Sequence, residues 1–234
     1  MVKDSLYETY NAIIPVYERT SKAITLGFLN EWRRKTLNLG LRVLNDLGNT
    51  PSVLDAGSGP GNMTIELIRS GVKPRRVVLL DQSVPMLNSA PNLNYIDKVC
   101  GSFELMPFRS SVFDMVIMGF SLHAVHDLRG TYCEISRVLN NGGVLASISI
   151  GKPTNKVYRA LGWLYTVIAV PLIALVFAGP RYVSYFYTIH NIYGRLPPND
   201  EFRNTAEGCL RLVQYRDEAL GLVNIIVMRK WNHD

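Results

Sequence analysis

The sequence predicts an α/β fold in which a mostly parallel sheet ends in an antiparallel hairpin. Short apolar runs between residues 52 and 150 alternate with helical segments, a pattern typical of parallel strands joined by crossover helices. A glycine-rich loop follows the first of these runs, and an acidic residue ends the second. Two later strand-like runs, 210–215 and 222–229, are joined by a link too short for a crossover helix, so they should pair antiparallel.

Composition places the chain among folded proteins. It has 234 residues, 47% hydrophobic and 19% charged, which excludes a disordered chain. Lys and Arg outnumber Asp and Glu by 25 to 19, a balance compatible with an anionic cofactor, an anionic membrane surface or RNA. Cys100, Cys133 and Cys209 are odd in number and far apart. We therefore expect no disulfide, a reduced cytosolic setting and, from the polar start, no secretory signal.

The N-terminal part predicts a helical cap over residues 1–50. Apolar residues from Leu6 to Tyr17 recur every three or four positions, and a second helix of about 28–47 follows an interruption near Gly27. The turn residues 48–51 should end it. Residues 51–234 form the main domain, and its elements between 52 and 150 are expected as follows: strands at 52–56, 76–80, 94–99, 113–120 and 144–150, and helices at 62–70, 84–89 and 127–139.

The glycine loop between the first strand and the first helix of the main domain is a candidate binding site. Glycines permit a tight turn and let backbone N–H groups approach a ligand. Asp81 lies twenty residues after Gly61, where a carboxylate can accept both hydroxyls of a ribose. The GxGxG spacing is neither that of a dinucleotide site nor that of a P-loop, and Pro60 lacks an N–H that a pyrophosphate would use. A purely structural turn is the alternative interpretation.

Residues 54–61, together with Asp81, resemble the first two motifs of class I S-adenosylmethionine (SAM)-dependent methyltransferases, and 113–116 and 134–143 look like later motifs. The resemblance implies a Rossmann-like sheet of seven strands and SAM as cofactor. It places the glycine loop behind the methionine part of SAM and Asp81 on its ribose. The cofactor-binding residues that it implies are Asp55, Ala56, Gly57, Ser58, Gly59, Gly61, Asp81, Gln82, Ser102, Phe103 and Phe120.

A narrower resemblance connects the chain with the menaquinone/ubiquinone-biosynthesis C-methyltransferases. It is carried by Tyr10 to Tyr17, Gly27 with Trp32-Arg33-Arg34, and the stretches 101–108, 120–125 and 151–153. It implies C-methylation of a lipophilic quinol precursor. The chain departs from the family at Ser102, where an Asp receives the adenine amino group, and at His123-Ala124, where an Arg-Asn pair lies beside the substrate.

His123 is the candidate catalytic residue. It follows the fourth strand, at the edge of the sheet where ligands bind in α/β folds. Histidine titrates near neutrality, so it can take the proton of a ring hydroxyl; a hydrogen-bonded histidine without chemistry is the alternative. Tyr7, Tyr10 and Tyr17, with His123, are candidates for the substrate mouth, although helix packing is the better explanation for each tyrosine taken singly. His126 and Asp127 lack a third ligand, so we expect no metal.

Residues 160–180 carry no charge and are long enough to span a bilayer. Spanning would separate the fifth and sixth strands of one sheet, and Pro171 should break the helix. We place an apolar lid at 154–196. It can cover a pocket for a lipophilic substrate, lie in the membrane interface, or form a homodimer interface.

The sequence thus indicates a SAM-dependent methyltransferase that C-methylates a lipophilic quinol. The alternatives are O- or N-methylation of another small molecule or lipid, and a non-catalytic cofactor-binding partner subunit. Nucleic acid is not an expected partner, because the basic residues are scattered and no base-gripping motif follows the fourth strand. The expected location is cytoplasmic, with peripheral membrane contact left open.

Overall fold

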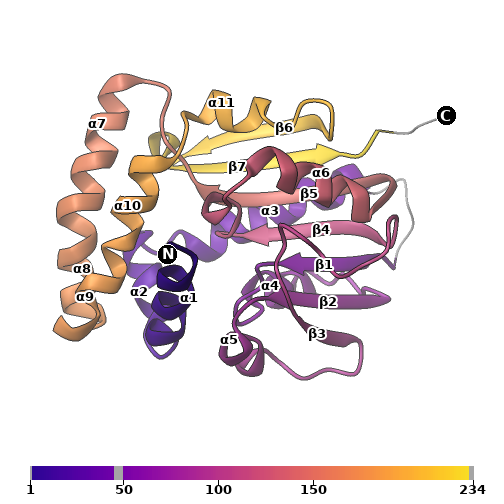
Figure 1. Cartoon of the computed structure of the whole chain (residues 1–234), viewed down its shortest axis with the longest axis horizontal. Helices are drawn as coiled ribbons and strands as arrows, with labels where there is room; N and C mark the ends of the chain where they lie inside the picture. Colours follow the sequence, from indigo (N-terminus) through magenta and orange to yellow (C-terminus); the bar gives the residue numbers. More distant parts are fainter. Residues whose placement is uncertain (1, 45–49, 232–234) are drawn as a thin grey trace.

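The computed structural model describes residues 2–44 and 50–231, with side chains from residue 8 onward. A seven-stranded sheet in the order β3-β2-β1-β4-β5-β7-β6 forms its centre (Figure 1). The strands are β1 (Ser52–Ala56), β2 (Arg76–Asp81), β3 (Ile96–Cys100), β4 (Phe113–Gly119), β5 (Leu139–Ile150), β6 (Arg211–Glu218) and β7 (Val223–Arg229).

The directions of the strands confirm the predicted mixed sheet. The strands β1 to β5 are parallel, whereas β7 pairs antiparallel with both β5 and β6. β1 has β2 on one side and β4 on the other, so the chain order reverses between β1 and β4. Ligands of open α/β sheets bind at the carboxyl ends of strands beside such a reversal.

Helices cover both faces of the sheet, because its central strands are apolar on both faces. One face packs against α3 (Leu29–Leu44), α4 (Asn62–Arg69) and α5 (Val84–Ser89). The opposite face packs against α6 (Leu128–Val138), α10 (Thr188–Arg195) and α11 (Asn199–Asn204). The predicted strands and helices of 52–150 are present with ends within two residues of those expected, except that β5 begins at Leu139, five residues earlier than expected.

The N-terminal segment forms three helices where two were expected. α1 (Val2–Ile13) and α2 (Tyr17–Ile24) are separated at Pro15, whereas the sequence pattern ran on to Tyr17. Proline disfavours helical backbone at the residue before it, which explains the break. The expected continuation of α3 to Leu47 and its stop at 48–49 lie outside the described residues.

The lid contains one long helix, so the predicted break at Pro171 is wrong. α7 (Lys156–Leu164), a π-helical turn η3 (Tyr165–Ala169) and α8 (Val170–Phe177) run on without interruption. Pro171 lacks a backbone N–H and its ring crowds the preceding turn. The wider π turn just before it provides the room, as in other helices with local irregularities.

The lid helices stand beyond the carboxyl ends of the parallel strands, next to α1 and α2 (Figure 1). α8, the short turn η4 (Pro180–Tyr182) and α9 (Val183–Phe186) share an apolar cluster with α1 and α2. This cluster is separate from the two that cover the sheet. The lid and the N-terminal helices therefore roof the edge of the sheet at which ligands are expected.

The expectation that no disulfide forms is wrong. Cys133 on α6 and Cys209, after α11, form a disulfide with their Cα atoms 4.8 Å apart. They are 76 positions apart in sequence, and spacing alone gave no sign that α11 folds back onto α6. Cys100 is a free, exposed thiol.

The close packing of α3 on the sheet yields a stability prediction. A Cβ added to Gly40 would lie 2.6 Å from Cβ of Ala146 on β5. Gly40→Val should therefore lower the free energy of unfolding by about 2 kcal/mol, since overpacking strains a core. Gly194→Val on α10, where an added Cβ meets nothing within 4 Å, is the matched control in chemical denaturation. Equal stability of the two variants would contradict this packing.

Candidate active site

The glycine loop is a cradle whose shape depends on three glycines. Gly57, Gly59 and Gly61 have φ angles of 70, 52 and 77°, a region that residues with a Cβ rarely adopt. A Cβ on Gly57 would lie 2.5 Å from Cβ of Ser121. A Cβ on Gly59 would meet no described atom within 4 Å, so the backbone there faces open space. The loop thus presents bare backbone to a ligand.

Asp81 connects the glycine loop to the end of β2. Its Oδ2 accepts a hydrogen bond from the Gly59 N–H at 2.8 Å, and its Oδ1 accepts one from the Ser83 N–H at 2.8 Å. Burial raises the pKa of Asp81, while these backbone hydrogen bonds oppose that rise. Each carboxylate oxygen keeps a further lone pair, so the fixed carboxylate can still accept two hydroxyls.

Asp55, near the end of β1 next to the glycine loop, has one carboxylate oxygen that lacks a hydrogen-bond partner among the described residues. Its Oδ2 accepts hydrogen bonds from the Thr64 hydroxyl at 2.8 Å and the Thr64 N–H at 3.2 Å. Its Oδ1 is buried and has no hydrogen-bond partner among the described residues. Burial raises the pKa of Asp55 to about 7. An unpaired buried carboxylate is costly, and a ligand ammonium group would relieve that cost.

A cavity of about 130 Å³ lies over the loop. Of the residues predicted for the cofactor, those that line it are Asp55, Gly57, Ser58, Gly59, Asp81, Gln82, Phe103 and Phe120. Ala56, Gly61 and Ser102 are not part of its lining. Ala56 is fully buried in β1, Gly61 precedes α4, and the Ser102 hydroxyl accepts from the Glu104 N–H at 3.2 Å.

The sequence interpretation did not single out Glu104, which lines this cavity together with Met86 and Ser121. Its carboxylate accepts the backbone N–H groups of His126 and Asp127 at the start of α6. Glu104 and Ser121 lie within the stretches 101–108 and 120–125 that carry the family resemblance, but residue type alone gave them no role, and Met86 on α5 belongs to no motif.

A second, mainly apolar cavity of about 600 Å³ adjoins the first. Its walls come from the N-terminal helices, the lid, the end of β5 and the turn before β7. Four residues line both cavities: Tyr10, Tyr17, Arg33 and Phe120. Phe120 has a φ of 57°, a strained conformation for a bulky residue that is common at functional sites. The two cavities therefore meet at the end of β4.

His123 lines the larger cavity from the turn η2 (Leu122–Ala124). Its Nδ1 lies 3.0 Å from the Ser149 hydroxyl and accepts the Ile150 N–H at 3.4 Å. Accepting a backbone N–H requires a lone pair on Nδ1, which assigns the proton of the neutral ring to Nε2. Burial lowers the pKa of His123 to about 4, so the ring is neutral at physiological pH.

Tyr10 and Tyr17 lie at the junction with their rings edge to face, 6.3 Å between centroids. Burial raises the pKa of both phenols, so they remain hydrogen-bond donors. The side chain of Tyr7 lies outside the described residues.

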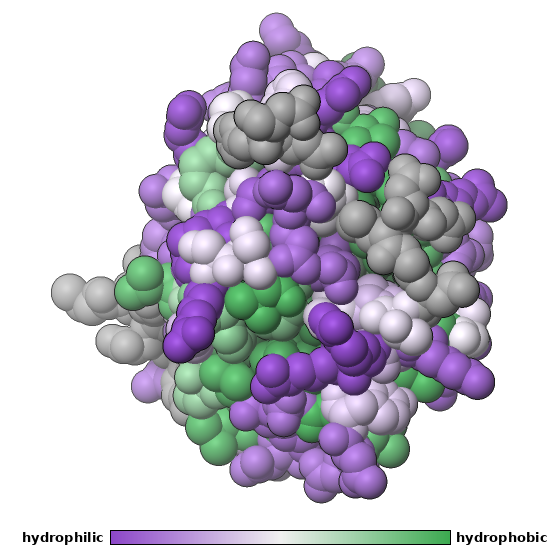
Figure 2. Space-filling view, turned by 90° about the vertical axis from the view of Figure 1, so that its right-hand side faces the viewer, coloured by the Kyte–Doolittle hydropathy of each residue, from purple (hydrophilic) through white to green (hydrophobic). Residues whose placement is uncertain are grey.

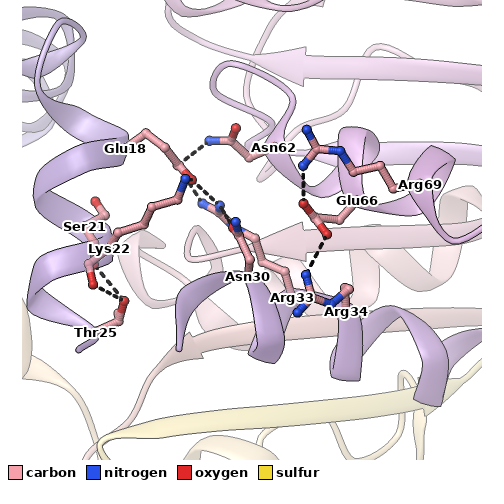
Figure 3. A network of polar contacts seen from close by, with 10 residues as sticks. All are labelled: Glu18, Ser21, Lys22, Thr25, Asn30, Arg33, Arg34, Asn62, Glu66 and Arg69. Atoms are coloured by element: carbon pink, nitrogen blue, oxygen red, sulfur yellow. Dashed lines mark hydrogen bonds and ion pairs between the residues drawn. The ribbon is translucent and has the colours of Figure 1, made fainter. Parts of the chain in front are cut away.

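A polar network ties the N-terminal helices to the glycine loop (Figure 3). Buried Arg33 on α3 donates to both oxygens of Glu18 on α2, at 2.8 and 3.2 Å. Asn62, at the start of α4, donates to the same carboxylate at 2.9 Å. Nε of Arg33 has no partner within the described ranges. The network fixes α2, which carries Tyr17, relative to the loop, and the Trp-Arg-Arg motif was its one trace in the sequence.

The residues present fit SAM. The bare backbone at Gly59 suits close approach of a ligand, Asp81 suits a ribose, and the free Oδ1 of Asp55 suits the α-ammonium group of the methionine part. With the strand order and the antiparallel β7, these features define a class I SAM-dependent methyltransferase.

Sequence comparison gives the family. The chain matches the ubiE/COQ5 methyltransferase family over residues 2–230 and belongs to it. It is 31% identical to a demethylmenaquinone methyltransferase of Lactiplantibacillus plantarum, over 76% of each chain. It is 28% identical to one of Desulfitobacterium hafniense, over 95% of this chain and 88% of the relative.

Solved structures agree on the fold. A methyltransferase in complex with the Trm112 activator of Haloferax volcanii has a TM-score of 0.60 at 14% identity, with 95% of this chain and 97% of that chain covered. A SAM-dependent methyltransferase of Thermotoga maritima has a TM-score of 0.59 at 16% identity, over 96% and 99%. The predicted fold class and cofactor are confirmed.

Removing the Asp81 carboxylate should weaken SAM binding more than tenfold, because both the expected ribose contact and the anchor of Gly59 would be lost. Asp81→Ala is compared by calorimetry with Asp97→Ala, a half-exposed acid on the neighbouring strand β3 that pairs with Arg76 at 2.6 Å. Similar affinities for the two variants would show that the ribose lies elsewhere.

The affinity for SAM should depend on the ionisation of Asp55. With its pKa raised to about 7, the carboxyl is mostly neutral at pH 6 and half ionised at pH 7, and the ionised form is the one expected to bind the ammonium group. Affinity should rise about fivefold between these pH values, and Asp55→Asn should abolish the rise. A flat profile for the unaltered protein would contradict the contact.

Proposed function

We propose that this enzyme C-methylates a lipophilic quinol precursor of the menaquinone or ubiquinone type. The observation that carries the proposal is the apolar cavity of about 600 Å³ that meets the cofactor cavity at Phe120. A quinol ring at this junction would lie at the cofactor, with its apolar tail under the lid. The names of the relatives, demethylmenaquinone methyltransferases at about 30% identity, support the same substrate class.

SAM supplies the methyl group as an electrophilic sulfonium, so the chain has to position a nucleophilic carbon and exclude water. Tyr10 and Tyr17 close the junction with aromatic faces and hydroxyl donors. Arg33 adds a buried guanidinium there, held in place by Glu18. These groups favour an acceptor whose ring oxygen carries negative charge.

For His123 the proposed role is hydrogen bonding to a ring oxygen of the acceptor. The sequence suggested a base, but a conjugate acid with a pKa of about 4 holds a proton weakly. Nδ1 is taken up by Ser149 and the Ile150 N–H. The Nε2–H is thus the ring group available to a ligand in the cavity, and it would orient the acceptor by donation.

For location we propose a cytoplasmic enzyme in peripheral contact with the membrane. One helix of the described chain, Lys156–Phe177, is long and apolar enough to cross a membrane by length and composition. The segments on either side of it return to strands β5 and β6 of one sheet. Crossing would therefore pull the sheet apart, whereas contact with one surface of a bilayer leaves it intact.

The test of the function is methyl transfer from labelled SAM to a demethylmenaquinol-type acceptor and to phospholipids. The proposal requires a product methylated on a ring carbon of the quinol. Transfer only to oxygen, nitrogen or phospholipid would contradict it. Binding of SAM without transfer to any acceptor would favour a non-catalytic subunit.

His123→Ala should lower kcat about tenfold or more and leave the Kd for SAM within twofold, because His123 lines the acceptor cavity and not the cofactor cavity. His123→Gln keeps an N–H donor and should restore part of the rate. The kcat profile of the unaltered enzyme should show no ionisation near pH 6.5. Unchanged turnover of the alanine variant would remove the proposed role.

A further inference from the structure

We propose that the outward face of the 156–177 helix docks on an anionic membrane surface, next to the entrance of the acceptor cavity. This inference rests on the proposed function for the identity of the substrate. The docking surface is defined by residues Leu161, Leu164, Ile168, Leu172 and Leu175, with Val157 and Val176 at its ends.

The helix has its large apolar residues on the outside. Its inward stripe consists of the smaller residues Gly162, Thr166, Val170 and Ala174, which are all buried. The five central residues of the docking surface are between 46 and 57% exposed, and 22% of the most apolar window of the helix is buried. A helix that only covered a core would show the reverse arrangement. A contiguous exposed apolar surface of this kind marks an interaction site.

The charges around the docking surface specify a bilayer as the occupant. From residue 151 to 199 the chain has five basic residues and no acidic one. Lys156 and Arg159 lie at the start of the helix, and Arg181 follows its end. Anionic headgroups attract such flanking cations while the apolar stripe enters the interface. A second copy laid on this face would bring cations against cations in either orientation.

The rim of the acceptor cavity borders the same helix. Leu26 and Leu220 line the cavity and are 72 and 61% exposed. Both have left-handed backbone, with φ of 51 and 58°, which costs about 1–2 kcal/mol for residues other than glycine. Phe28 is the third exposed apolar residue of this rim. The protein therefore holds apolar side chains in solvent, on strained backbone, at the mouth of an apolar cavity.

The rim and the helix are joined by direct contacts. The Tyr165 hydroxyl donates to the carbonyl of Ile24, two residues before Leu26. Gly162 packs so closely on Leu222, two residues after Leu220, that an added Cβ would lie 2.3 Å from its Cδ2. An apolar tail could pass from the bilayer into the cavity without crossing water. At the opposite end of the molecule, hydrophobic areas are interrupted by many hydrophilic residues (Figure 2).

Vesicle sedimentation tests the docking surface. The unaltered protein should sediment with phosphatidylcholine/phosphatidylglycerol vesicles, and binding should fall at least tenfold for the double variant Ile168→Glu/Leu172→Glu. Leu93→Glu/Val213→Glu changes two residues of similar exposure, 42 and 41%, and should bind like the unaltered protein. Calorimetric Kd values for SAM should agree among all three, which shows that each is folded.

A second double variant, which removes two positive charges, tests the proposal independently of the apolar substitutions. Lys156→Gln/Arg181→Gln should weaken binding to anionic vesicles at least threefold and leave the weaker binding to pure phosphatidylcholine unchanged. Equal sedimentation of the Ile168→Glu/Leu172→Glu variant and the unaltered protein would overturn the proposal. So would a dimer in light scattering that this variant dissociates, without vesicle binding, because a second copy would then cover the face.

The two proposals can fail separately. Vesicle binding that depends on Ile168 and Leu172, without methylation of any quinol, would support the docking surface and refute the proposed function. Methylation of a short-tailed quinol in solution without vesicle binding would refute the docking surface alone.

Discussion

The active site depends on the carboxylate of Asp81, which accepts the N–H groups of Gly59 and Ser83 at the same time. These two hydrogen bonds join the loop after β1 to the loop after β2, across the point where a nucleoside would lie. Gly59 takes part with a φ of 52°, a conformation that residues with a Cβ rarely adopt. The same geometry leaves backbone facing open space, and so the residue proposed to bind the ribose also shapes the cradle for the rest of SAM.

Much of this arrangement could be predicted from the sequence, because it is local. The strand, the glycine loop, the next strand and Asp81 are close in the chain, and their chemistry follows from residue type and spacing. The parallel strands followed from the alternation of apolar runs with helical segments, and the antiparallel C-terminal hairpin followed from a link too short for a crossover helix. What could not be predicted depends on distant packing. The Cys133–Cys209 disulfide, the role of Glu104 in the cavity wall and the low pKa of His123 arise from segments that sequence spacing does not relate.

The lid shows how a correct local rule can give a wrong result. Proline does disrupt a regular helix, but the π turn at Tyr165–Ala169 accommodates Pro171 and the helix continues. The result is one continuous helix with small residues on its inward face and large aliphatic residues on its outward face. It roofs the acceptor cavity and, on our proposal, also contacts the bilayer. The Glu18–Arg33 pair holds the other wall of that cavity against the glycine loop (Figure 3).

The central claim is tested most directly by a crystal structure of the protein with S-adenosylhomocysteine. The account predicts both ribose hydroxyls within hydrogen-bond distance, about 3 Å, of Asp81, the ammonium group on Oδ1 of Asp55, and the sulfur directed toward Phe120. A nucleoside bound away from Asp81, or a sulfur directed away from the apolar cavity, would contradict it.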